Sequence, residues 1–237
     1  MRTVAEFEPT VRAFELWRAV EAQHRVSTMV LVDTLDEQAL LERLLEQSKP
    51  AVPESQRRLH WLLFTPFRYP PLPSGSRFRG PADPGVFYGA DLARTACAEL
   101  GYWRWRLLLD SPGLDALDPM QQTLFCTPVR GATIDLQSPP WTKRRKLWTD
   151  RTDYSACQEL ARGARTAGIQ MIRYQSVRDP EAGDCTAVLT HTAFAAPAPT
   201  ASQTWTLAVF RRRVVWHCDS IFENLSFEFN AENWLGD

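Results

Sequence analysis

Apolar residues recur at helical spacing through much of the first fifty residues. The positions that carry this pattern are Phe14, Trp17, Val20, Leu40, Leu41, Leu44 and Leu45. Asp36 is a candidate N-cap residue, and Pro50 and Pro53 end the second run. The pattern predicts helices between residues 10 and 48 that form an N-terminal cap packed on the rest of the chain. Because leucine pairs pack equally well against another chain, a dimer or partner face is the alternative.

The middle of the chain alternates short apolar runs with loop signals. We expect a strand at 61–65, a strand at 86–88, a helix over 92–105 and one or two strands within 124–136. Prolines and glycines between residues 70 and 80 predict a long loop. In the helix over 92–105, Glu99 shares a face with Leu92, Ala96 and Leu100. Glu99 therefore lies near the face that packs inward, where a lone charge is costly unless it has a partner.

The remainder of the chain predicts one more helix and further strands. A helix over 154–167 is stopped by Gly168, and a strand over 169–174 follows it. Residues 138–150, with basic and tryptophan side chains, and the Ala/Pro-rich residues 193–201 are expected to be loops.

Two C-terminal segments alternate between apolar and polar positions, with Arg211–Arg213 in the connection between them. The alternating residues are Trp205, Leu207, Val209, Phe227 and Phe229, which is typical of half-buried strands. Since helices and strands mix without regular βαβ order, we expect an α+β fold: a mixed β core with flanking helices. We expect one domain, in which residues 1–59 are the helical cap and residues 60–237 the core.

Composition narrows the class of protein. The chain has 237 residues, of which 44% are hydrophobic, and a net charge of -1, which gives no general attraction to nucleic acid or acidic membranes. The N-terminus carries acidic residues and lacks the apolar core of a signal peptide, and no apolar run is long enough to span a bilayer. We expect a cytoplasmic protein without membrane or direct nucleic-acid contact. The basic run 143–146 between Trp141 and Trp148 could indicate nucleic-acid contact, but the near-neutral net charge favours a solvated loop. If the loop lies near the pocket, it could also help to bind an anionic substrate.

Cysteine and histidine positions argue against a metal site or a disulfide framework. The five cysteines are scattered, without a C-x-x-C pair, and each of the four histidines stands alone. We expect reduced thiols and neither a zinc site nor another metal site. The nine tryptophans are expected mostly in the core.

The richest chemistry lies between Arg68 and Glu99. Arginines next to glycine and proline indicate a loop that grips an anion, and a single carboxylate follows one helix later. These residues would suit a dinucleotide with a ribosyl bond to a cationic leaving group, such as NAD. That leaving group departs neutral, so one carboxylate suffices to stabilise the developing ribosyl charge, without the acid pair of ordinary glycosidases. Candidates for these roles are Arg68, Tyr69, Arg77, Tyr88, Glu99 and Ser176.

The order and spacing of these residues resemble the RES-domain family, which is named for its Arg, Glu and Ser. The motifs are Arg68-Tyr69, S-R-F-R-G-P, F-Y-G-A-D-x-x-x-T-A-x-A-E, and a glycine-led I-x-x-I-x-Y-x-S-V-R that contains Ser176. Arg77, Tyr88 and Glu99 follow one another at intervals of 11 residues. The resemblance covers roughly residues 60 to 215. Two positions depart from the family pattern: Arg79 stands where Asn is common, and Gln175 replaces the proline before the serine.

The resemblance implies an ADP-ribosyltransferase-like fold and a toxin of a bacterial toxin–antitoxin pair that degrades NAD. Carried over residue by residue, Arg68 and Arg77 would bind NAD, Tyr69 and Tyr88 would line the pocket, and Glu99 and Ser176 would be catalytic-site residues, with Arg68 beside them. NAD would be the substrate and phosphate a possible co-substrate, with no bound cofactor. A helix-turn-helix antitoxin would cover the active site, and a homodimer is possible. Hydrolysis, phosphorolysis and ADP-ribosyl transfer stay open, as does a catalytically silent member that only binds a partner.

Overall fold

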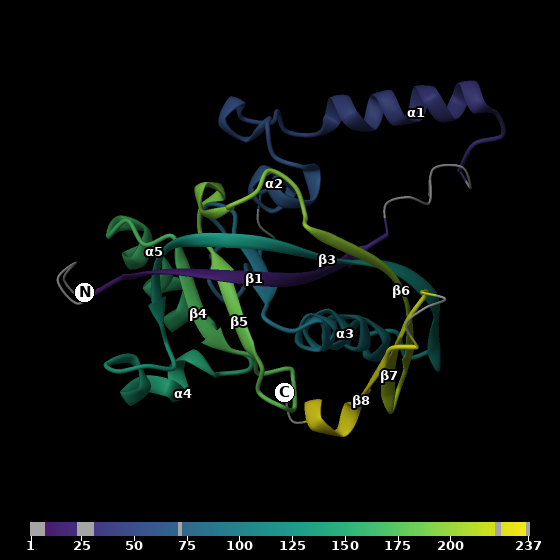
Figure 1. The fold of residues 1–237 in the computed structure, drawn as a ribbon. Helices are drawn as coiled ribbons and strands as arrows, with labels where there is room; N and C mark the ends of the chain where they lie inside the picture. The colour runs from purple at the N-terminus through teal and green to yellow at the C-terminus, as the bar shows by residue number, and fades with distance from the viewer. Residues whose placement is uncertain (1–7, 23–30, 71–72, 221–223, 236–237) are drawn as a thin grey trace.

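A single mixed β-sheet organises the molecule (Figure 1), and the computed structural model describes residues 8–22, 31–70, 73–220 and 224–235. The strands are β1 (Thr10–Glu21), β2 (Phe87–Ala90), β3 (Ala116–Asp135), β4 (Met171–Gln175), β5 (Asp184–Val188), β6 (Ala201–Phe210), β7 (Arg213–Cys218) and β8 (Ser226–Asn230). Their order is β1-β2-β5-β4-β3-β6-β7-β8, with β3 and β4 parallel and the other neighbours antiparallel. Because β1 also pairs with β3, strands β1, β2, β5, β4 and β3 form a closed ring.

Helices cover both sides of this sheet. They are α1 (Leu35–Ser48), α2 (Trp61–Arg68), α3 (Ala93–Leu109), α4 (Arg145–Trp148) and α5 (Ser155–Thr166), with short 3-10 helices at Glu54–Gln56, Trp141–Arg144, His191–Ala193 and Ala231–Trp234. Ile172 and Tyr174 of β4 pack with α5, whereas the adjacent Met171 packs with α2. Successive strand residues point to opposite faces, so α5 and α2 lie on opposite sides of the sheet. The expected α+β class is confirmed.

Several predicted elements form as expected. The helix over 92–105 is α3, the strand at 86–88 is β2, and the helix over 154–167 is α5. Gly168 stops α5 with a φ of 74°, a left-handed conformation that glycine adopts without strain. The alternating C-terminal segments are β6 and β8.

The helix predicted at the start of the region 10–48 is wrong. Residues Thr10–Glu21 form β1, which pairs with β3 from Thr10 opposite Thr133 to Glu21 opposite Gln122. Leu16 packs toward α2 while Trp17 packs toward α3. Both faces of β1 are at least partly covered from Leu16 to Val20, whereas Val11, Ala13 and Glu15 are exposed. In the covered part the apolar residues do not alternate, and a spacing of three places neighbours on opposite faces.

The strand predicted at 61–65 is also wrong, because this segment is the first part of α2. The His60 side chain caps the helix by accepting a hydrogen bond from the backbone N–H of Leu62. Leu62 and Leu63 are buried while Trp61 is exposed. Short apolar runs do not distinguish a strand from one buried turn of helix by periodicity, and here the tertiary contacts decide.

Helix α1 forms at the predicted leucine repeat but buries none of its residues. Its N-cap is Thr34, which accepts from the backbone N–H of Glu37, two residues before the expected Asp36. Leu40 and Leu44 are about half exposed. Figure 1 shows α1 extending beyond α2, away from the sheet. The leucines of α1 therefore do not pack into the core as the predicted cap requires.

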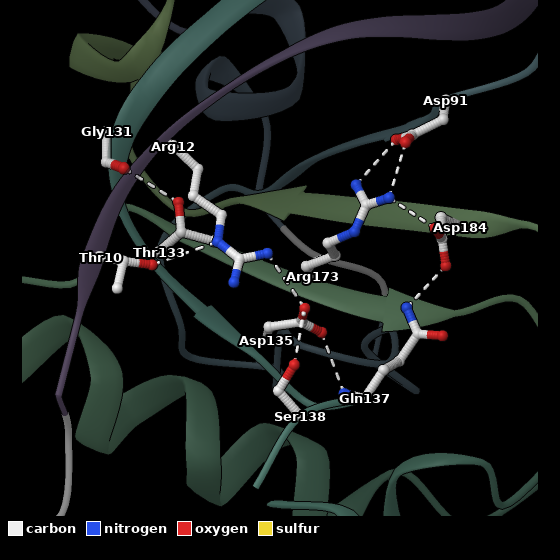
Figure 2. Close-up of polar contacts among 10 residues, drawn as sticks. All are labelled: Thr10, Arg12, Asp91, Gly131, Thr133, Asp135, Gln137, Ser138, Arg173 and Asp184. Atoms are coloured by element: carbon white, nitrogen blue, oxygen red, sulfur yellow. Dashed lines mark hydrogen bonds and ion pairs between the residues drawn. The ribbon is translucent and has the colours of Figure 1, made fainter.

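A polar network fixes the strand ends that precede α3 (Figure 2). Arg173 of β4 donates to both carboxylate oxygens of Asp91, at 3.0 and 2.7 Å, and also pairs with Asp184 of β5. Asp91 lies directly between β2 and α3. Gln137 links Asp184 to Asp135 of β3, which in turn accepts a hydrogen bond of 3.2 Å from Arg12 of β1. The network thus fixes the junction from which α3, and with it Glu99, leaves the sheet.

Candidate functional site

A cavity of about 380 Å³ lies between β1, β2 and the first half of α3, and we call it the Glu99 cavity. The loop 74–77 closes one side, and Tyr154, Tyr174, Arg178 and Cys185 complete the lining. Gly75 in this loop has a φ of 65°, and a Cβ there would lie 2.3 Å from the Arg79 carbonyl oxygen. Among the described residues that line the cavity, Glu99 carries the one carboxylate. An anionic substrate would therefore meet arginines, tyrosines and a single acid.

Glu99 and Ser176 are brought together by the fold, as the sequence predicted. The Ser176 hydroxyl donates to Glu99 Oε1 at 2.6 Å, and Ser176 Oγ accepts from the backbone N–H groups of Arg178 and Asp179 at 3.1 and 3.0 Å. A hydroxyl has one hydrogen and two acceptor sites, so the two backbone donors direct that hydrogen to Glu99. In this geometry the Ser176 hydroxyl group holds one oxygen of the Glu99 carboxylate in place.

The turn that carries Ser176 is fastened to α3 by Asp179. The Thr95 hydroxyl donates to Asp179 Oδ2 at 2.7 Å, and Arg94 pairs with Asp179 Oδ1. Thr95 lies one helical turn before Glu99. These contacts fix the turn that carries Ser176 against the helix that carries Glu99.

Burial raises the pKa of Glu99 above the ordinary value of 4.5. The hydrogen bond from Ser176 and the positive charges of Arg77 and Arg178 act in the opposite direction and favour the carboxylate. A raised pKa is typical of a carboxyl group that is partly removed from water, and such shifted pKa values are common among residues of active sites.

Arg77 enters the same cavity and is held by backbone carbonyls. Its Nη1 donates to the carbonyl oxygens of Trp148 and Asp150 at 2.9 and 2.8 Å, and its guanidinium lies 4.6 Å from the Tyr154 ring centroid. Because these partners are neutral, the positive charge of Arg77 stays available for an anion.

Tyr88 positions Arg77. The Tyr88 hydroxyl accepts from the backbone N–H of Phe78 at 2.9 Å and forms a 2.8 Å hydrogen bond with the Ser76 hydroxyl, so it holds the chain on both sides of Arg77. Burial raises the pKa of Tyr88 to about 12. The hydroxyl therefore stays neutral and keeps both bonds at physiological pH.

Arg68 and Tyr69 lie apart from the other predicted site residues. They line a second cavity of about 410 Å³, which we call the Arg68 cavity, beneath α1 and α2. Arg68 donates to the Pro50 carbonyl and pairs with Glu46 of α1 at 3.2 Å. Neither Arg68 nor Tyr69 belongs to the lining of the Glu99 cavity. Arg77, Tyr88 and Glu99 thus line one cavity, with Ser176 hydrogen-bonded to Glu99, whereas Arg68 and Tyr69 line the other.

The basic segment 143–146 is exposed, as expected, although it forms a 3-10 turn and α4 where a loop was predicted. Trp141 and Trp148, which flank it, are buried against each other, with ring centroids 6.2 Å apart. The Trp148 carbonyl holds Arg77, so a residue that flanks the segment, and not the segment itself, contributes to the site through its backbone.

Two residues that depart from the family pattern have structural roles. Arg79 donates to the carbonyls of Tyr69 and Asp83, at 2.7 and 3.2 Å, and so stabilises the loop after α2. Gln175 accepts a hydrogen bond from Arg145, next to α4. Arg79 thus adds its charge to the loop framework and not to the Glu99 cavity.

Sequence reasoning missed several cavity residues. Trp17 and Arg18 come from β1, and the helix expected there concealed them. Trp103 lies one turn after Glu99 on α3 and is about half exposed at the cavity. Arg178 follows Ser176 by two residues, inside the quoted motif, and its guanidinium lies 3.7 Å from the Tyr102 ring centroid. Only Arg178 carried a signal in the sequence, namely its place in that motif.

The described residues were predicted to hold neither a metal site nor a membrane span. In the part of the chain that it describes, no group of three or more His, Cys, Asp or Glu side chains could hold a metal ion. None of the described helices has the length and apolarity needed to cross a bilayer. All five cysteines are free and buried. His24 lies outside the described residues.

Comparison with known proteins identifies the family. The RES domain matches residues 51–209, which is more than half of the chain. A similar solved structure is that of the toxin–antitoxin complex MbcT–MbcA of M. tuberculosis, with a TM-score of 0.50 and 16% identity over 84% of this chain and 87% of that one. At this identity the likeness concerns the fold. No functionally curated protein matches the sequence. From the extent of the domain match, the chain belongs to the RES-domain family.

Proposed function

We propose that this protein is a RES-type toxin enzyme that degrades NAD by cleaving the bond between nicotinamide and ribose. The observation that carries the proposal is the Glu99 cavity, where one partly buried carboxylate accepts the Ser176 hydrogen bond and faces Arg77. Membership of the RES-domain family supports it.

The chemistry fits a site with one acid. When the C1′–N bond breaks, its electron pair goes to nicotinamide, which leaves as a neutral molecule and needs no proton. Positive charge develops on the ribosyl carbon, and an ionised Glu99 would stabilise that charge in a site of low dielectric constant. Arg77 would bind a substrate phosphate, and Tyr154 and Trp103 offer aromatic surface to a base.

The acceptor that attacks C1′ would be water or inorganic phosphate. Water gives ADP-ribose, and phosphate gives ADP-ribose carrying a phosphate at C1. Transfer of ADP-ribose to a macromolecule is the alternative outcome of the same cleavage.

We further propose an antitoxin partner of helix-turn-helix type that covers the active site in the cytoplasm. The neighbouring structure is itself a toxin–antitoxin complex. The exposed leucines of α1 offer an apolar surface to that partner or to a second copy of this chain.

The test is incubation of purified protein with NAD, with and without phosphate, followed by mass spectrometry of the products. We expect nicotinamide release, and loss of the carboxylate in Glu99→Gln should slow it on the order of 100-fold or more. Glu159→Gln, an exposed glutamate of α5, is the matched control and should act as the wild type does. Equal NAD turnover in folded Glu99→Gln protein would sink the assignment. With labelled NAD, label that appears only on macromolecules would favour the ADP-ribosyltransferase. If NAD stays intact, the remaining hypothesis is a catalytically silent protein that binds a partner.

A further inference from the structure

The Glu99 and Arg68 cavities meet at one side chain. Arg18 of β1 belongs to the lining of both, and it is the one charged residue that they share within the described chain. It lies where β1 and β2 separate, since these strands pair only at Trp17 and Ala90. The opening between the two strands is therefore occupied by a guanidinium.

Arg18 is incompletely satisfied in this position. Its Nη1 donates to the Tyr88 carbonyl at 2.8 Å, and its guanidinium lies 4.9 Å from the Phe87 ring centroid. Its Nε is buried and has no hydrogen-bond partner among the described residues. No described carboxylate pairs with it either.

Three other arginines near the sheet, in contrast, have carboxylate partners. Arg12 pairs with Asp135, Arg173 with Asp91 and Asp184, and Arg104 with Glu21. Withdrawing a guanidinium from water without an anionic partner is unfavourable, and an incoming anion reverses that cost. The fold keeps Arg18 in the state that an anion would stabilise.

The surroundings point to the kind of anion. The Arg68 cavity adds the cations Lys49 and Arg68, with Glu46 as its single acid, and the Glu99 cavity adds Arg77. If the ribosyl bond under attack lies at Glu99, the phosphates of a dinucleotide extend away from that carboxylate, which repels them. At the junction between the cavities, Arg18 adds its positive charge to those of these cations.

We propose that Arg18 binds the pyrophosphate of the dinucleotide at this junction, so that one nucleoside half lies in the Glu99 cavity and the other extends to the Arg68 cavity. This assignment rests on the proposed function for the identity of the substrate. It also gives the two separated groups of predicted residues a common ligand. Residue 18 lies outside the matched range 51–209, so the family match assigns it no role.

The experiment measures ADP-ribose binding by calorimetry and the KM for NAD in the wild type, Arg18→Met and Arg18→Lys. Methionine keeps the length and packs on Phe87 without a charge. We expect Arg18→Met to weaken ADP-ribose binding and raise KM by about 10-fold or more, as for loss of a charge-assisted hydrogen bond to phosphate. Arg18→Lys should retain part of the affinity. The matched control is Arg130→Met, an exposed arginine of the neighbouring β3, which should change neither quantity.

Thermal unfolding separates binding from a structural role. Arg18→Met removes the hydrogen bond to the Tyr88 carbonyl but also the cost of withdrawing an unpaired guanidinium from water, so the variant should melt no lower than the wild type. Unchanged ADP-ribose affinity in Arg18→Met overturns the proposal. A lower melting temperature together with equal loss of affinity in the Met and Lys variants also overturns it, because that result describes a structural arginine. If wild-type protein leaves NAD intact, the proposed function fails, while ADP-ribose calorimetry still decides the role of Arg18.

Discussion

The Glu99 cavity and the Arg68 cavity hold their functional side chains in different ways. Around Glu99, the partners are buried groups: the Ser176 hydroxyl, two backbone N–H groups behind it, and the carbonyls that hold Arg77. Around Arg68, the acidic partner is Glu46, whose side chain is 61% exposed on a helix with no buried residue. The first site is preorganised by the fold, whereas the second depends on contacts that a ligand can replace at low cost.

After the loss of the Glu99 carboxylate itself, the largest effect should come from breaking the preorganisation at Ser176. In Ser176→Ala, Glu99 loses its hydrogen bond and two buried N–H groups lose their acceptor. We expect NAD cleavage to fall about 10-fold or more and stability to fall by on the order of 2 kcal/mol. Since the lost bond favours the carboxylate, the pKa of Glu99 should rise further, and the acid limb of the pH–rate profile should move to higher pH.

The control for this variant is Ser202→Ala, an exposed serine of β6. A profile that keeps its position in Ser176→Ala, even with lower activity, would show that Ser176 does not act through Glu99.

A second test concerns the stability cost of the buried carboxyl group. Below pH 4.5, Glu99 is protonated in both the folded and the unfolded chain. As the pH rises through the higher pKa of the folded state, ionisation destabilises the fold, because the folded state binds the proton more tightly. Glu99→Gln should therefore melt above the wild type at pH 8, and the difference should shrink toward pH 4.5. Melting curves across this range check the sign, and a difference that grows on acidification would contradict the burial argument.

The smallest effect is expected at the Arg68 cavity. Glu46→Gln releases Arg68 and Lys49 from their carboxylate. If Arg68 contacts substrate phosphate, KM for NAD should fall by roughly twofold to fivefold, as for removal of an exposed competing ion pair. Glu54→Gln, an exposed glutamate outside both cavities, is the control. An unchanged KM would limit Arg68 to holding the segment before α2.

The sequence predicted the fold best where local signals and tertiary packing agree. Helix α3, helix α5 with Gly168, and the alternating strands β6 and β8 follow from periodicity and stop signals. The sequence predicted β1 and α2 wrongly. A strand that is covered on both faces over part of its length loses its alternation there, and a short apolar run is compatible with either a strand or a helix.

The candidate site divides in the same way. Glu99 and Ser176 lie 77 residues apart in the chain, yet their motif spacing placed them in one site, and their side chains share a hydrogen bond of 2.6 Å. Arg68 and Tyr69 belong to the same set of motifs, but the structure places them in another cavity.

The sequence by itself determined the chemical inventory: one inward-facing carboxylate on a helix, arginines in Gly/Pro-rich loops, and the motif order of the RES domain. Those features can be read from residue types and from their spacing along the chain. Only the tertiary structure decided which groups satisfy one another. The long pairing of β1 with β3 brings Arg18 between two cavities and leaves its Nε without a partner. Whether Arg18 has a partner depends on all the segments that pack around it, which are distant in the chain. No single stretch of sequence therefore predicts it.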